Sequence, residues 1–115
     1  MEQERNKNKK LENLYKTKGS CCHYCTKNTP FIHITKDHVY PKSSGFTLDN
    51  NWVFSCRSCN TKKGNMHPKV YITFLISKIV VILKKIAQNN FIATQSQVDK
   101  IKFHHGIMMQ TKQLI

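Results

Sequence analysis

Acidic residues are scarce in this chain of 115 residues: six Asp and Glu stand against 19 Lys and Arg, which gives a formal net charge of +13. The excess is spread along the chain, at +4 over residues 1–34, +3 over 35–63 and +6 over 64–115. Lys and Arg side chains that neutralise phosphates release condensed counterions. The composition therefore predicts a polyanionic partner, most simply DNA or RNA, and the alternative is that the charge only keeps the chain soluble.

The sequence also lacks a long apolar run. Its longest apolar region, Val70 to Ile86, is interrupted by Lys78, Lys84 and Lys85, which excludes a helix that spans a bilayer. The first ten residues carry six charges and no apolar stretch, which argues against a secretory signal. We therefore expect an intracellular protein, cytoplasmic or nuclear, with no membrane partner. The Lys-, Asn- and Ile-rich composition suggests an AT-rich genome, such as that of a virus or phage.

The length fits one small domain with flanking segments, and a core of this size is marginal unless something staples it. We expect residues 1–19 to form a basic N-terminal arm or helix. Residues 68–115 are predicted to be a C-terminal helical region, because apolar residues recur every three or four positions from Pro68 to Ala87 and again from about Gln95. The functional residues are then expected between these parts, in residues 20–67.

Four of the five cysteines form two Cys-x-x-Cys pairs, Cys22 with Cys25 and Cys56 with Cys59. In a chain without a secretory signal, such pairs indicate a metal site before they indicate disulfides. Zinc prefers four soft ligands in a closed tetrahedron when its role is structural. We predict a structural zinc site that ties the two pairs together, with Cys21 as a spare thiol. The alternative is four unrelated core cysteines.

The segment between the two pairs has the pattern of a hairpin followed by a helix. Residues Phe31 to Asp37 alternate in polarity, which predicts a strand that Pro41 ends. A turn is expected at Lys42 to Gly45, and the short apolar run Trp52 to Ser55 is the return strand. The helix is expected from Arg57 to Lys63. The fold class is therefore α+β.

An Asp-His pair, Asp37 and His38, follows the first predicted strand. Phosphodiester hydrolysis needs an activated water and a Lewis acid on the phosphate oxygens. A neutral histidine can take a proton from water near neutral pH, and a carboxylate can hold a hard cation such as Mg²⁺. Adjacent strand residues point to opposite faces, so the two side chains serve one site only if the strand bends there. Pro41 favours such a bend.

The order and spacing of these residues resemble the HNH family of nucleases, also called the ββα-metal or His-Me finger type. The matching residues are Cys22-x-x-Cys25, Asp37-His38-x-x-Pro41, Asn51, and Cys56-x-x-Cys59-Asn60-x-x-Lys63-Gly64. The resemblance implies a small ββα-metal motif stapled by a four-cysteine zinc site, with flanking helices. It also implies a metal-dependent DNA endonuclease that leaves a 5′-phosphate and a 3′-hydroxyl.

The resemblance assigns roles residue by residue. His38 matches the general base, and Asn51 matches the central Asn that fixes the loop so that the base is aimed correctly. Asp37 and Asn60 match the ligands of the catalytic divalent ion, Mg²⁺ or Mn²⁺. Lys63 is expected to contact the phosphate or the leaving group.

The chain departs from the family pattern at Ser44-Gly45, where Gly-Gly is frequent, and at Ser55, where Leu is frequent. Asn50 is adjacent to Asn51, and the spacing to Cys56 favours Asn51 as the central Asn. Two alternatives to a nuclease stay open. One is a non-catalytic, zinc-stapled module that binds nucleic acid, and the other is an interaction protein whose C-terminal helices dock a second copy or a larger partner.

Overall fold

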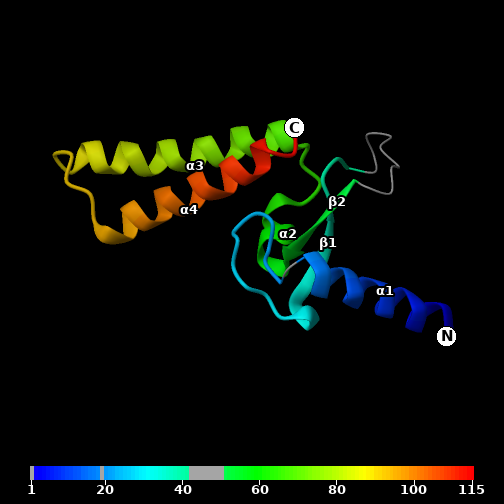
Figure 1. Ribbon diagram of the computed structural model, residues 1–115. Coiled ribbons are helices and arrows are strands. Elements are labelled where there is room, and N and C mark those ends of the chain that lie inside the picture. Colours follow the sequence, from blue (N-terminus) through cyan, green and yellow to red (C-terminus); the bar gives the residue numbers. More distant parts are fainter. Residues whose placement is uncertain (1, 19, 42–50) are drawn as a thin grey trace.

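The computed structural model describes residues 2–18, 20–41 and 51–115 (Figure 1). Its elements, in chain order, are α1 (Glu2–Lys18), the short 3-10 helix η1 (Phe31–His33), β1 (Ile34–His38), β2 (Trp52–Cys56), α2 (Arg57–Lys63), α3 (Pro68–Gln88) and α4 (Gln95–Lys112). The α+β class predicted from the sequence is confirmed. The turn expected at Lys42 to Gly45 and Asn50 lie outside the described residues.

The centre of the molecule is the predicted strand–strand–helix unit. Strands β1 and β2 pair antiparallel, with Ile34 opposite Cys56 and His38 opposite Trp52. Helix α2 begins directly after β2, and the Cys56 sulfur caps it by accepting a hydrogen bond from the Cys59 backbone N–H (3.4 Å). The helix ends at Gly64, whose φ of 54° is a conformation that glycine adopts without strain.

The first strand begins later than predicted. Phe31 to His33 form a 3-10 turn, and the strand starts only at Ile34. The turn forms because the Pro30 carbonyl accepts a hydrogen bond from the backbone N–H of His33 (2.9 Å), which bends the chain where an extended backbone was expected. The alternating polarity of this segment therefore overstated the strand by three residues.

The loop before this turn folds back onto the sheet. The backbone N–H of Cys22 donates to the Lys27 carbonyl (3.0 Å), and the N–H of His23 donates to the Phe54 carbonyl in β2 (2.8 Å). A cluster of buried apolar side chains forms around this loop, and its members are Cys22, Tyr24, Cys59, Tyr71, Leu75 and Ile107. The core is therefore centred on the cysteines, and α3 and α4 contribute to it only where they meet the central unit.

Helix α1 docks on the sheet through one aromatic side chain. The Tyr15 hydroxyl donates to the Thr29 carbonyl (2.6 Å), and its ring lies against Phe31 and Phe54, with centroids 5.3 and 6.2 Å away. The basic segment expected at residues 1–19 is thus largely helical. Among its described side chains, Lys9, Lys10 and Lys16 are exposed.

Helices α3 and α4 form an antiparallel hairpin that extends away from the central unit (Figure 1). Pro68 begins α3, and a capping box of Thr94 and Gln97 begins α4. These two helices account for most of residues 68–115. The molecule is elongated, with extents of 61 × 30 × 21 Å. Among the described helices, not one combines the length and the apolarity that crossing a membrane requires.

Candidate active site and metal centre

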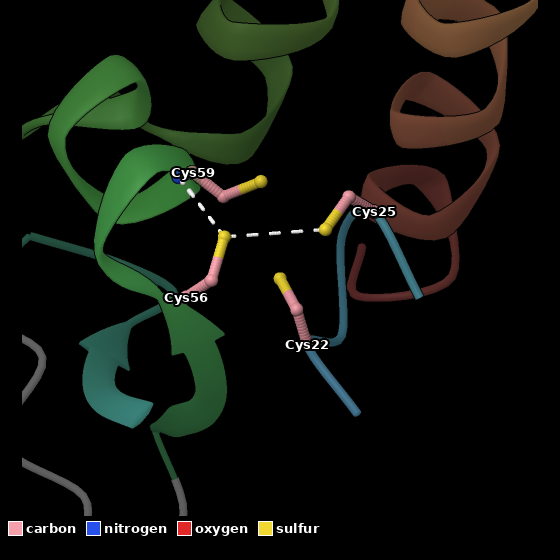
Figure 2. Close-up of side chains that lie close together, drawn as sticks. All are labelled: Cys22, Cys25, Cys56 and Cys59. Atoms are coloured by element: carbon pink, nitrogen blue, oxygen red, sulfur yellow. Dashed lines mark hydrogen bonds between the residues drawn. The ribbon is translucent and has the colours of Figure 1, made fainter. Parts of the chain in front are cut away.

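The four paired cysteines lie together at one end of the hairpin sheet, and their sulfur atoms are all within 4.8 Å of one another (Figure 2). Tetrahedral zinc with Zn–S bonds of 2.3 Å needs sulfur atoms about 3.8 Å apart. The Cys25 and Cys56 sulfur atoms are 3.9 Å apart. All four are free thiols, and Cys21 is exposed and outside the cluster. The geometry therefore fits the predicted zinc site.

The electrostatics of the cluster also fit a cation. A hydrogen bond from the Cys59 thiol lowers the pKa of Cys22 to about 4, against the opposing effect of burial. The same hydrogen bond, together with burial, raises the pKa of Cys59. One thiolate therefore forms readily while its neighbour keeps its proton. Ionisation of all four thiols in so small a space requires a positive charge between them, and Zn²⁺ supplies it.

The Asp-His pair lines a pocket of about 260 Å³ between the end of β1 and helix α2. Asp37, His38 and Asn60 line it together with Lys36, Pro41, Gly64 and Asn65. His38 is exposed, whereas Asp37 is only 3% exposed. Strand alternation alone would have separated Asp37 from His38, yet both reach this pocket at the strand end.

The Asn60 side chain is oriented by a chain of hydrogen bonds. Its Nδ2 donates to the Thr35 hydroxyl oxygen (2.9 Å), and the Thr35 hydroxyl donates to the Ser55 carbonyl (2.8 Å). Since the single proton of Thr35 is directed to Ser55, the Thr35 oxygen can only accept from Asn60. The Oδ1 atom of Asn60 is thereby the amide atom available to a cation. Thr35 was not singled out in the sequence, because only the packing of α2 on β1 brings it to Asn60.

Asn51 fixes the backbone that follows His38. Its Oδ1 accepts from the Tyr40 N–H and its Nδ2 donates to the Tyr40 carbonyl, both at 2.8 Å. The Asn51 carbonyl accepts from the Val39 N–H (3.2 Å), and the side chain is buried. The hydrogen bonds of Asn51 therefore hold the two residues that directly follow His38.

Lys63 is placed differently from the prediction. The residue is 0% exposed, and its ammonium lies 3.3 Å from Asp37 Oδ2 and donates to the His38 carbonyl (2.9 Å). A buried ammonium with these partners cannot contact a phosphate in solution, so that expectation is corrected. The i, i+3 spacing does place Lys63 on the face of Asn60, but that face packs on β1.

Tyr24 connects the cysteine cluster to the pocket. It stands between Cys22 and Cys25, is 1% exposed, and its hydroxyl donates to Asp37 Oδ2 (2.5 Å). Burial and the contact with Asp37 raise the pKa of Tyr24 well above its usual range, so that it stays a donor. Sequence reasoning missed this residue. The signal in the sequence was its position between two predicted metal ligands, because the core of a small domain readily buries an aromatic residue there.

A two-stranded antiparallel sheet packed on a short helix, with a four-cysteine cluster and an Asp-His-Asn pocket, is the arrangement that the resemblance to the ββα-metal type implied. The sequence model of the HNH endonuclease family matches residues 22–66. Over these residues the chain is therefore similar to an HNH domain. No curated protein matches the chain.

We expect the Cys56→Ser variant to lose bound zinc and its cooperative unfolding transition, because structural Zn²⁺ contributes about 10–16 kcal/mol of apparent binding free energy in zinc-finger peptides. Cys21→Ser is the matched control, since Cys21 adjoins Cys22 but lies outside the cluster. The measurements are zinc content per chain and thermal unfolding followed by circular dichroism. A wild-type protein that is fully folded without zinc would contradict the assignment.

We expect the Lys63→Met variant to lower the free energy of unfolding by about 3–5 kcal/mol, because it leaves the buried Asp37 carboxylate without its cation. Lys62→Met is the control, since Lys62 is exposed and its ammonium lies only over the Phe103 ring, 5.4 Å from the centroid. Urea unfolding of both variants measures the difference. Equal and small losses would show that Lys63 is not the structural partner of Asp37.

Proposed function

We propose that this chain is a metal-dependent HNH endonuclease that hydrolyses phosphodiester bonds of DNA. The observation that carries the proposal is the meeting of Asp37, His38 and the Asn60 amide in one pocket. A protein that only holds nucleic acid needs neither a base nor oxygen ligands in an open site.

The oxygen atoms in the pocket suit a hard divalent cation. The Tyr24 hydroxyl and the Lys63 ammonium both contact the Oδ2 atom of Asp37. The Asn60 amide directs its Oδ1 atom away from Thr35. These carboxylate and amide oxygens are ligands that Mg²⁺ and Mn²⁺ accept. When bound there, the ion would polarise the phosphate and stabilise the charge on the leaving oxygen.

His38 acts as the general base in the proposed reaction. A neutral ring nitrogen takes a proton from a water molecule, and the water oxygen forms a bond to phosphorus. The bond between phosphorus and the 3′ oxygen breaks, and that oxygen keeps the electron pair and acquires a proton from solvent. The products are a 5′-phosphate and a 3′-hydroxyl.

Three buried residues position these groups without contacting the substrate. Lys63 and Tyr24 both bind Asp37 Oδ2, which holds the carboxylate in one place and keeps a charge balance in the interior. Lys63 also binds the His38 carbonyl, and Asn51 clamps the next peptide. The aim of His38 therefore depends on its backbone being held from two sides.

Lys36 takes the place of Lys63 as the cation for the phosphate. It is exposed and lines the pocket, on the same face of β1 as His38. Its ammonium lies 4.4 Å from the centroid of the Trp52 ring, which holds it near the strand end. The net charge of +13 provides the wider attraction to a phosphate backbone.

We expect His38→Ala to reduce plasmid nicking by about 10²-fold or more, the lower end of general-base contributions. His33→Ala is the control, because His33 is also exposed but lies outside the pocket. The protein is dialysed free of loosely bound metal, its zinc content is verified, and supercoiled plasmid is supplied with Mg²⁺ or Mn²⁺. Circular dichroism and DNA binding must be unchanged in the variant.

The same assay separates the two classes of function. Cutting that needs the added metal and is lost in His38→Ala supports the nuclease. Salt-sensitive DNA binding without cutting by the wild type, at any concentration of Mg²⁺ or Mn²⁺, would instead establish the zinc-stapled binding module.

We expect Asn60→Ala to raise the Mn²⁺ concentration needed for half-maximal cutting by about 10- to 100-fold, the effect typical of weakening a metal site by one supporting group. Asn65→Ala is the control, because Asn65 lines the same pocket from the exposed turn after α2. The measurement is initial nicking rate against Mn²⁺ concentration. An unchanged metal dependence in Asn60→Ala would remove Asn60 from the ligand set.

A further inference from the structure

Helix α3 carries a second apolar face that the nuclease proposal does not use. Its residues recur at alternating spacings of four and three, and they are Ile72, Ile76, Ile79, Leu83 and Ile86. This is the a/d pattern of a coiled coil over two heptads, with Ile76 and Leu83 at a positions and the other three at d positions. We call these five residues the α3 seam.

The α3 seam borders the face that packs on α4, and three of its members are half-buried, namely Ile72, Ile79 and Ile86. Tyr71 and Leu75 of α3 are the residues buried with Ile107 of α4 in the core cluster. By contrast, Ile76 is 46% exposed and Leu83 is 50% exposed. Ile76 and Leu83 therefore remain open to solvent in the part of the chain that the structure describes. An aliphatic row of this length on one helix indicates that another helix packs against it.

The distribution of charge around the seam indicates what that partner is. The three lysines of the middle and end of α3, Lys78, Lys84 and Lys85, occupy b and c positions, on the side away from the seam. The e and g positions that border a seam are uncharged, and they are Thr73, Leu75, Val80, Ile82 and Ala87. An acidic partner would be selected by lysines at the border of the interface, and there are none.

A second copy of this chain satisfies the same constraints. Two identical aliphatic rows are self-complementary about a two-fold axis, and their lysines then point outward and apart. Residues at g positions already face α4 within each hairpin, so pairing along the seam would place four helices around one core. We propose that two copies of this chain associate through their α3 seams, with the two α3–α4 hairpins forming a dimeric four-helix bundle.

The experiment measures the mass of the full-length, zinc-loaded protein by sedimentation equilibrium over a concentration series, after removal of nucleic acid. We expect the wild type to have the mass of two chains. Leu83→Glu places two charges in the paired interface and is expected to raise the dimer dissociation constant by at least about a hundredfold. Val81→Glu is the matched control, because Val81 is 51% exposed and lies at an f position, opposite the seam.

A monomeric wild type, or equal dissociation by Leu83→Glu and Val81→Glu, would overturn the proposal. Ile76→Glu gives a second test of the same seam, and the helicity of every variant is checked by circular dichroism. Added salt should strengthen the dimer, since it screens the repulsion between two basic chains, whereas association through bound DNA would weaken. The measured mass does not depend on cutting activity, so the dimer proposal and the nuclease proposal can be rejected independently.

Discussion

The constraint on which the structure depends is the meeting of two cysteine pairs that are about thirty residues apart. In the residues that the structure describes, the sheet has two strands of five residues each, and a two-stranded sheet is marginally stable in water. The buried apolar side chains gather around the sulfur atoms rather than along the sheet. A metal held by the four thiols would therefore supply the stability that a core of this size does not provide.

Buried polar contacts connect the proposed active site to the cysteine cluster and hold its side chains in place. Tyr24 lies between the two cysteines of the first pair, and its hydroxyl binds the Asp37 carboxylate. Lys63 lies on α2, the helix that carries Cys59 of the second pair, and its ammonium binds the same carboxylate. A buried ion pair is costly to desolvate, and it is retained where its position matters more than its energy. Here the pair fixes both Asp37 and the His38 carbonyl, so the metal centre and the pocket behave as one unit.

The sequence predicted the parts of this arrangement that depend on local spacing. Two residues between cysteines, the order of Asp37 and His38, and the position of Asn51 relative to Cys56 are all visible in the chain. The orientation of the Lys63 side chain could not be predicted. The i, i+3 spacing places Lys63 on the same helix face as Asn60, but it does not say which element packs on that face. Tyr24 and Thr35 gain their roles only from the packing of α2 and the first cysteine loop on β1. The 3-10 turn at Phe31 to His33 was missed because it keeps a polarity pattern that a strand would also show.

The two ends of the molecule satisfy opposite physical requirements. The HNH end buries charge and polar groups, and it does so only because each has a partner at hydrogen-bond distance. The hairpin end exposes aliphatic side chains on α3, among them Ile76 and Leu83. Polar residues at these positions would suit a solvent-facing helix equally well. Helix propensity does not favour them either, since isoleucine is a weaker helix former than the lysines beside it. An aliphatic row at heptad spacing, bordered by uncharged positions, is accounted for when a second helix covers it.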